Sequence, residues 1–219
     1  MKIAVLTYDV PHRKTQDLLM RLLVHPLEVI VIATPFSKRK QHKCLYKHRP
    51  DMDTGISTKT ICERVGYTYI EDSNIYNPII NEGIETVLIG GSGIIKLDER
   101  VNIINSHPGY LPFNRGLDAL KWAIYEGYPV GVTTHVIDDN IDLGKLIDQR
   151  IIKVGYYDTF HSLAYKQYQL EIEMLADAVY QPIGENILAD DHKPKRRMPM
   201  ELEPIMMERF NKRRKASSV

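Results

Sequence analysis

Residues 86–109 read TVLIGGSGIIKLDERVNIINSHPG. Two runs in this stretch are short, apolar and rich in β-branched residues, namely Thr86–Ile89 and Val101–Asn105. The first runs into a group of glycines, and the second is followed closely by a Pro-Gly pair. Apolar runs bounded in this way are typical of buried β-strands. The stretch therefore predicts two buried strands that each end in a turn.

Strand-like and helix-like segments alternate before this stretch. Buried-strand patterns cover residues 2–7, 27–33 and 67–70, and helical patterns cover residues 18–23, 58–65 and 75–82. Alternation of this kind is typical of βαβ units, whose strands pair in parallel. The fold class that we predict is α/β, with a doubly wound, Rossmann-like, mostly parallel sheet.

The pattern changes in the second half of the chain. Two strand-like segments, 130–137 and 145–154, are separated only by residues 138–144. So short a connection predicts an antiparallel hairpin rather than a helical crossover. A long helix is predicted to follow over residues 158–180.

The C-terminal residues differ in character from the rest. We expect one α/β domain over residues 1–182 and a basic tail over residues 183–219, with a short helix over 204–212. The apolar residues of the tail, Met198, Met200, Leu202, Ile205 and Met206, suggest that it packs on the body or on a partner subunit. A nucleic-acid role for the tail has little support, because Phe210 is its only aromatic residue and bases bind by stacking.

The composition is that of a globular protein with a core. Of 219 residues, 43% are apolar and 26% are charged. The apolar run Val29–Ala33 is far too short to span a membrane, and the N-terminal residues lack the apolar region of a secretory signal. Cys44 and Cys62 are too few for a disulfide framework or a structural zinc site. We expect a cytoplasmic protein.

The formal net charge is +1, but basic residues gather in the segment 36–49, which contains no acidic residue. This segment includes Lys38, Arg39 and Lys40. A basic block in a near-neutral protein can bind an anionic ligand such as a phosphate. A solvated loop explains the same residues equally well, and both interpretations stay open.

The residues after the two strands of the opening stretch suit a catalytic site. In a parallel sheet, sites form beyond the carboxyl ends of strands. Residues 90–93 are mostly glycine, so their backbone can approach a ligand closely. Side chains alternate along a strand, so Asn105 and His107 point to the same side and Ser106 points away. An amide donor beside an imidazole suits acyl transfer, because the amide can stabilise an oxyanion and the imidazole can move a proton.

The hairpin turn supplies three acids that could approach the imidazole of His107, namely Asp138, Asp139 and Asp142. A neighbouring carboxylate would favour the charged imidazolium. Spacing does not choose among the three, and Asp138 and Asp139 also suit an ordinary turn.

Other chemistries lack their motifs. Ser92 is not in a nucleophile elbow, because Ile94 stands where G-x-S-x-G requires glycine. Residues 90–96 contain neither the dinucleotide-binding nor the Walker A motif. His107 and His135 lack the spacing of a metal-ligand motif, so we expect no metal.

Four motifs then follow in order: N-x-H-P at residues 105–108, L-P-x-x-x-G at 111–116, G-x-T-x-H at 131–135 and D-x-G at 142–144. In this order and spacing the sequence resembles the folate-dependent formyltransferases. That family includes glycinamide ribonucleotide transformylase, the catalytic domain of methionyl-tRNA formyltransferase and the sugar N-formyltransferases. Residues 112–116 with Trp122 are most similar to the sugar enzymes. General similarity extends over roughly residues 1–182 and implies the formyltransferase fold.

The resemblance implies that Asn105, His107 and Asp142 are the catalytic residues. Asn105 and protonated His107 would stabilise the oxyanion, and Asp142 would hold His107. The implied formyl donor is 10-formyltetrahydrofolate. The implied acceptor is a primary amine of a phosphorylated small molecule, and a nucleotide-linked amino sugar fits best.

The resemblance also implies two sets of binding residues. The donor would contact Ile89, Gly90, Gly91, Ser92, Gly93, Ile94, Ile95, Asp138, Asp139 and Asn140. The amine substrate would contact Arg13, Lys38, Arg39, Lys40, Tyr110, Asn114, Arg115, Gly116 and His135. For His135, a packed strand histidine is nearly as good an explanation.

Two departures from the family bear on the substrate. Glycinamide ribonucleotide transformylase has a Gly-rich phosphate loop after its first strand, where residues 7–13 here read TYDVPHR. We expect no counterpart of the domain with which methionyl-tRNA formyltransferases hold tRNA. The alternatives are a glycinamide ribonucleotide formyltransferase-like enzyme of purine synthesis and a non-catalytic folate-binding relative. We expect no nucleic-acid or membrane partner, and the tail allows a homodimer.

Overall fold

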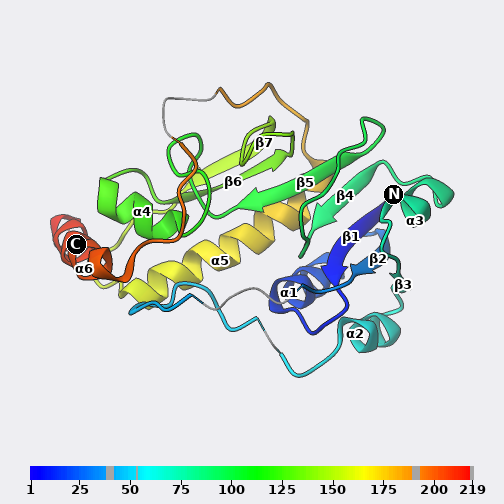
Figure 1. The fold of residues 1–219 in the computed structure, drawn as a ribbon, viewed down its shortest axis with the longest axis horizontal. Coiled ribbons are helices and arrows are strands. Elements are labelled where there is room, and N and C mark those ends of the chain that lie inside the picture. Colours follow the sequence, from blue (N-terminus) through cyan, green and yellow to red (C-terminus); the bar gives the residue numbers. More distant parts are fainter. Residues whose placement is uncertain (38–41, 53, 189–192, 218–219) are drawn as a thin grey trace. The chain divides into compact units, whose positions relative to one another are not determined.

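Figure 1 shows the computed structural model of the protein, which describes residues 1–37, 42–52, 54–188 and 193–217. The strands are β1 (Lys2–Tyr8), β2 (Glu28–Thr34), β3 (Thr68–Glu71), β4 (Thr86–Ile89), β5 (Asn102–His107), β6 (Gly131–Val136) and β7 (Lys145–Ile151). The helices are α1 (Arg13–Leu22), α2 (Thr58–Val65), α3 (Tyr76–Asn81), α4 (Ala119–Glu126), α5 (Phe160–Asp177) and α6 (Glu203–Ala216). Two short 3-10 helices span Ala178–Tyr180 and Met200–Leu202.

The seven strands form one mixed sheet in the order β3-β2-β1-β4-β5-β6-β7. Strand β1 pairs in parallel with β2 and β4, and parallel pairs also join β2 to β3 and β4 to β5. Strands β6 and β7 pair antiparallel. The predicted doubly wound, mostly parallel sheet with an antiparallel hairpin is therefore confirmed.

The chain divides into two compact units, neither of which is one continuous segment. The first comprises Met1–Arg39, Asp51–Asn105 and Leu175–Tyr180, and the second comprises Lys40–Pro50, Ser106–Met174 and Gln181–Val219. The domain boundary at residue 182 stays a prediction.

The core of the first unit is made by its β-branched runs and one amphipathic helix. Residues 3–6 of β1 and 29–33 of β2 are all buried. On α1 the buried leucines are Leu18, Leu19 and Leu22, which share one face because a helix repeats every 3.6 residues. The spacing that predicts the helix also includes Leu23, which is 43% exposed and lies just beyond the end of α1.

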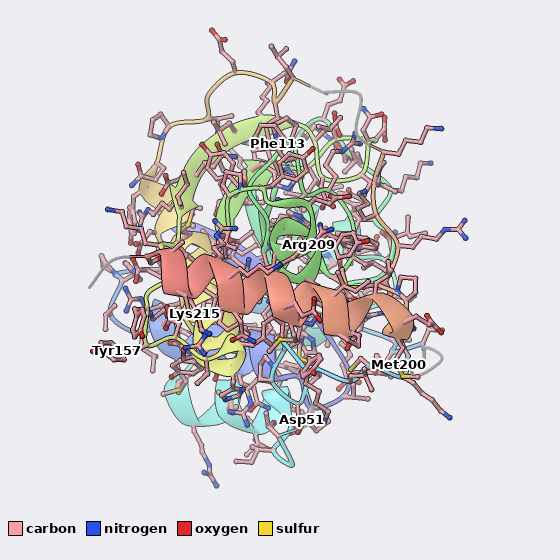
Figure 2. All side chains as sticks on the ribbon, turned by 90° about the vertical axis from the view of Figure 1, so that its left-hand side faces the viewer. Asp51, Phe113, Tyr157, Met200, Arg209 and Lys215 are labelled. Carbon is pink, nitrogen blue, oxygen red and sulfur yellow. The ribbon has the colours of Figure 1, made fainter. Side chains whose placement is uncertain are left out.

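The core of the second unit joins α4, α5 and the C-terminal helix. Its buried members are Leu120, Ala123, Ile124, Val130, Val132, Ile152, Val154, Phe160, Leu163, Ala164, Met174, Met198, Met206 and Phe210. Helix α6 packs beside α4, and Figure 2 shows Arg209 and Lys215 along it. Within the described ranges, no helix is both long and apolar enough to cross a lipid bilayer.

Every predicted helix boundary except those of α2 differs from its position in the structure, and two of the differences have a local reason. Helix α5 begins at Phe160, because Thr159 and Ser162 exchange hydrogen bonds between backbone N–H and hydroxyl and so cap it there. Helix α6 continues to Ala216 rather than ending at residue 212. The basic residues 213–215 in its last turn suit the negative end of the helix dipole.

Candidate active site

Asn105 and His107 lie on β5, which continues to His107 rather than ending at Asn105 as predicted. His107 is buried, with 4% of its surface exposed, whereas Asn105 is half-buried. Among the described residues, the Asn105 amide makes no hydrogen bond within the protein. This amide is therefore free to donate to a ligand.

Asp142 is the acid that reaches His107. Its Oδ1 lies 3.3 Å from the Nδ1 of His107. Asp142 has a φ of 51°, in the left-handed region that aspartate tolerates better than most residues. The turn closes tightly after it, because a Cβ on Gly144 would lie 2.1 Å from the carbonyl oxygen of Val136. The tight turn brings the acid back to the imidazole.

Both ring nitrogens of His107 face acceptors. Nδ1 faces the Asp142 carboxylate, and Nε2 lies 2.6 Å from the backbone oxygen of Asn114. Only the imidazolium carries a donor on both nitrogens, so the charged form satisfies both contacts. The structure thus holds His107 in its protonated form by geometry alone.

The electrostatics agree with this geometry. Burial disfavours charge on His107, but the Asp142 carboxylate and the Asn114 carbonyl raise its pKa above the usual value. Burial also disfavours charge on Asp142. There the His107 imidazolium and the Gly116 N–H outweigh burial and lower the Asp142 pKa to about 2. His107 and Asp142 form a buried ion pair.

Three consecutive residues, Asn114, Arg115 and Gly116, hold this pair. The Asn114 carbonyl accepts from His107, the Arg115 Nε donates to the Ile141 carbonyl at 2.9 Å, and the Gly116 N–H donates to the Asp142 Oδ2 at 2.5 Å. We predicted these three residues as substrate contacts, which stays a prediction. Sequence reasoning missed their contacts with the ion pair. The sequence signal for these contacts is Gly116 shortly before a helix. A glycine there predicts a tight turn, but it does not predict which residues the turn contacts.

Two other predicted contact residues lie nearby in the second unit. His135 is buried on β6, and its ring nitrogens have no hydrogen-bond partner in the described part of the chain. Burial and the charge on His107 lower its pKa, so His135 is neutral. Tyr110 is half-buried, and its ring stacks on Phe113 with 6.4 Å between centroids.

The hairpin turn shows where the remaining acids lie. The Asp138 carboxylate accepts from the backbone and side-chain nitrogens of Asn140, and so closes the turn. Asp139 is exposed. Their predicted contacts with the donor stay predictions. No group of three His, Cys, Asp or Glu residues in the described ranges is placed to hold a metal ion.

The glycine loop after β4 lies in the first unit and has two parts. A Cβ on Gly90 or Gly91 would collide with the chain itself, at 2.7 Å from Thr15 or from His12. These two glycines therefore allow close packing of the protein. Residues 92–95 instead border a pocket of about 440 Å³. The pocket is lined by Leu6, Thr34, Pro35, Ser73, Asn74, Ile75, Tyr76, Ser92, Gly93, Ile94, Ile95 and Lys96.

Of the predicted basic contacts in the first half of the chain, Arg13 is the one that the structure describes. Arg13 is the first residue of α1, and its backbone N–H donates to the Met52 carbonyl. Lys38, Arg39 and Lys40 lie outside the described residues. Sequence reasoning also missed an internal role in the basic segment, because Arg49 forms an ion pair with Glu171, whose side chain is 1% exposed.

Residues 91–179 match the family model described as formyl transferase. The dTDP-4-amino-4,6-dideoxyglucose formyltransferase of Mycobacterium tuberculosis is 36% identical over 81 residues, which is 37% of this chain and 35% of that protein. The phosphoribosylglycinamide formyltransferase of Bacillus subtilis is 34% identical over 85 residues, or 38% of this chain and 44% of that protein. The matches thus span less than half the length of either relative.

A solved structure shows the same fold. It is a sugar 3N-formyl transferase determined in the presence of dTDP and 5-N-formyl-THF, with a TM-score of 0.56 at 18% identity. The likeness covers 84% of this chain and 65% of that one. The resemblance predicted from the four motifs is confirmed over residues 91–179, which are similar to the formyl transferase family.

Proposed function

We propose that this protein is a folate-dependent N-formyltransferase that acts on a primary amine. The observation that carries the proposal is the buried His107–Asp142 ion pair, which lies two residues along the chain from a free Asn105 amide. These residues belong to the segment that matches the formyl transferase family model. A protein that only bound folate would not need this charged pair.

Each residue has a distinct task in the proposed reaction. When bound, 10-formyltetrahydrofolate supplies the formyl carbon, which exchanges its bond to N10 for a bond to the amine nitrogen while a proton passes from the amine to N10. Asn105 donates a hydrogen bond to the formyl oxygen as negative charge develops on it. The positive charge on His107 stabilises the same oxygen, and Asp142 keeps His107 protonated.

The loop after β4 fits a flat donor molecule. A Cβ on Gly93 would meet no atom within 4 Å, so the backbone there is open to a ligand. The adjacent pocket of about 440 Å³ lies within the range of small-molecule sites. Residues 92–95 would hold the pterin, and the turn residues 138–140 are the other proposed contacts.

For the acceptor we propose a nucleotide-linked amino sugar. The support is the similarity to the mycobacterial dTDP-sugar enzyme and the residues 112–116, which resemble the sugar enzymes. Residues 7–13 also lack the glycine-rich phosphate loop of glycinamide ribonucleotide transformylase. Glycinamide ribonucleotide is the second candidate acceptor, because the phosphoribosylglycinamide formyltransferase of Bacillus subtilis is 34% identical over the matched residues.

The test is mass spectrometry of amines incubated with the protein and 10-formyltetrahydrofolate. The panel holds dTDP-, UDP- and GDP-linked amino sugars, glycinamide ribonucleotide and methionyl-tRNA. We expect formylation of one sugar nucleotide. Asn105→Ala should lower turnover by about 10²–10³, as loss of one oxyanion donor does elsewhere. Asn102→Ala is the matched control, because Asn102 is exposed at the start of the same strand.

Two results would contradict the proposal. One is the absence of a formylated product from every amine in the panel. The other is an Asn105→Ala variant whose turnover equals that of Asn102→Ala. Formylation of glycinamide ribonucleotide alone would keep the formyltransferase and replace the sugar acceptor.

A further inference from the structure

The residues before the last helix run beside the hairpin that carries Asp142. The Ile187 N–H donates to the Gly144 carbonyl at 2.7 Å, two residues after Asp142. Leu146, the second residue of β7, exchanges backbone hydrogen bonds with this segment, donating to Glu185 and accepting from Gly184. The C-terminal segment is thus hydrogen-bonded to the end of the catalytic turn.

A second contact lies at the loop that holds the ion pair. Lys195 pairs with this loop as a strand would: its N–H donates to the Arg115 carbonyl at 2.8 Å, and its carbonyl accepts from the Leu117 N–H at 2.9 Å. Only glycine fits between these bonds, because a Cβ on Gly116 would lie 2.3 Å from the Lys195 oxygen. Any side chain at position 116 would therefore collide with the backbone of Lys195.

One peptide group connects the tail to the catalytic acid. The Arg115 carbonyl and the Gly116 N–H belong to the same planar peptide. The carbonyl accepts from Lys195, and the N–H donates to Asp142. A hydrogen bond at one end fixes the plane and strengthens the bond at the other, because linked hydrogen bonds polarise one another.

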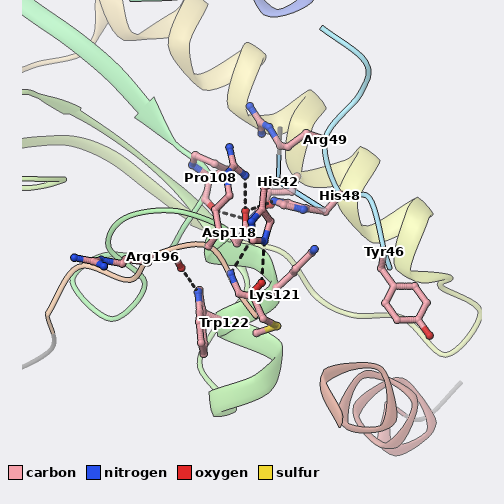
Figure 3. Close-up of polar contacts among 12 residues, drawn as sticks. His42, Tyr46, His48, Arg49, Pro108, Asp118, Lys121, Trp122 and Arg196 are labelled. Atoms are coloured by element: carbon pink, nitrogen blue, oxygen red, sulfur yellow. Dashed lines mark hydrogen bonds and ion pairs between the residues drawn. The ribbon is translucent and has the colours of Figure 1, made fainter. Parts of the chain in front are cut away.

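A buried carboxylate, that of Asp118, follows Leu117 in the loop and anchors the tail. Asp118 has a left-handed φ of 54°, and its side chain is 2% exposed. It accepts hydrogen bonds from the Arg197 Nη1 and the Met198 N–H, both at 3.0 Å, and His48 lies 3.7 Å away. Figure 3 shows Asp118 among these polar contacts. The loop is therefore held by the tail on both sides of Gly116.

We propose that Lys195 is a positioning residue of the active site, whose backbone N–H orients the Arg115–Gly116 peptide toward Asp142. The expected effect on catalysis rests on the proposed function. The structural part of the inference is independent of that function: the C-terminal segment holds the peptide that orients Asp142 toward His107. No contact between Lys195 and substrate is involved.

The test compares two proline variants of the full chain. Lys195→Pro removes the N–H in question together with the side chain that pairs with Glu126, and Lys195→Ala removes that side chain alone. Arg196→Pro is the matched control, because in the described part of the chain the Arg196 N–H makes no hydrogen bond. Circular dichroism and thermal unfolding establish that each variant folds.

The readout is the pKa of His107, measured by NMR from its imidazole Cε1–H signal, which the His107→Gln spectrum assigns. The charged or titratable groups that act on His107 are Asp142 in the turn, His135 on β6 and Glu171 on α5. We expect this pKa to fall by about 0.5–1 pH unit in Lys195→Pro, as loss of one supporting hydrogen bond would produce, and to stay unchanged in Arg196→Pro. The kcat of formyl transfer should fall roughly three- to tenfold with KM unchanged, which is the same loss expressed as a rate.

A second variant keeps the inference testable if Lys195→Pro does not fold. Arg197→Ala removes a half-exposed side chain that ties the tail to Asp118. Loss of a positive charge alone would raise the pKa of His107, whereas a loosened tail would lower it. The direction of the pKa change in Arg197→Ala therefore distinguishes the two effects. Equal His107 pKa values in Lys195→Pro and Arg196→Pro, or a rise in Arg197→Ala, would overturn the inference. If the wild type formylates no amine, the proposed function fails, and the NMR titration still measures the role of Lys195.

Discussion

The carboxylate of Asp142 sets the charge state of His107. Its neighbourhood raises the pKa of His107, so the basic limb of the activity profile should lie above the usual histidine range. Asp142→Asn keeps the size and the left-handed backbone, which asparagine also tolerates, and removes only the charge. We expect the basic limb of kcat/KM to move to lower pH, with less turnover at pH 7. The measurement is the rate of formyl transfer from about pH 5.5 to pH 9.

The same pair gives a stability profile whose sign can be worked out. The Asp142 pKa is lowered to about 2, so its contribution is present above the ordinary aspartate pKa and is lost as pH falls toward 2. The His107 pKa is raised, so its contribution is present below about 6.5 and is lost as pH rises through the raised value. Asp142→Asn should therefore cost most stability between about pH 4 and pH 6.5. Asp148→Asn, on β7, is the control, and equal profiles for the two variants would refute the argument.

Part of the site could be predicted at the scale of the residue. Asn105 and His107 follow from strand alternation alone, which needs no tertiary information. The choice of Asp142 over Asp138 and Asp139 came from the resemblance, because turn spacing leaves all three open. The contact between Asp142 and His107 depends on a left-handed φ at Asp142 and on the tight turn at Gly144. The spacing of residues in the sequence predicts neither.

At the scale of the element, Glu203 holds the first turn of α6. Its carboxylate is fully buried and accepts a hydrogen bond from the Nζ of Lys121 on α4 at 2.8 Å. It also accepts hydrogen bonds from the backbone N–H groups of Leu45 and Tyr46. Glu203→Ala would leave the Lys121 charge buried without a partner, which costs roughly 3–5 kcal/mol of unfolding free energy. Urea denaturation measures this change.

Glu201→Ala is the matched control for that prediction, because Glu201 is exposed in the turn just before α6. It should change the unfolding free energy by no more than about 0.5 kcal/mol. In the double variant Glu203→Ala/Lys121→Ala the loss should be smaller than the sum of the single losses, because the second substitution removes the orphaned charge. Equal losses in Glu203→Ala and Glu201→Ala would show that the buried pair does not hold α6.

The elements themselves could be predicted where apolar spacing defines them. Helix α2 and strand β4 have the predicted bounds, because both are framed by turn residues. Strand β5 is longer than predicted, since its last residues are polar and their extended backbone has no apolar signature. The same reason applies to the basic last turn of α6.

At the scale of the whole molecule, buried β-branched runs were enough to predict the sheet and its hairpin. The contact of the tail with residues 115–117 could not be predicted, because it is made by backbone hydrogen bonds that leave no side-chain pattern. The predicted packing of the tail apolar residues is uneven. Met198 and Met206 are fully buried, whereas Met200 and Ile205 are each 40% exposed.

The distribution of charge over the whole molecule leads to a prediction about the substrate. Within the basic segment 36–49, Arg49 is already neutralised by Glu171, so its charge is not available to a ligand. If the substrate carries phosphate, the triple variant Lys38→Ala/Arg39→Ala/Lys40→Ala should raise its KM about tenfold and leave kcat unchanged, because these charges attract the anion without touching the formyl group. Arg49→Ala should instead lower stability. Steady-state kinetics at two salt concentrations measures the effect, and a KM that neither the triple variant nor salt changes would assign the segment to a solvated loop.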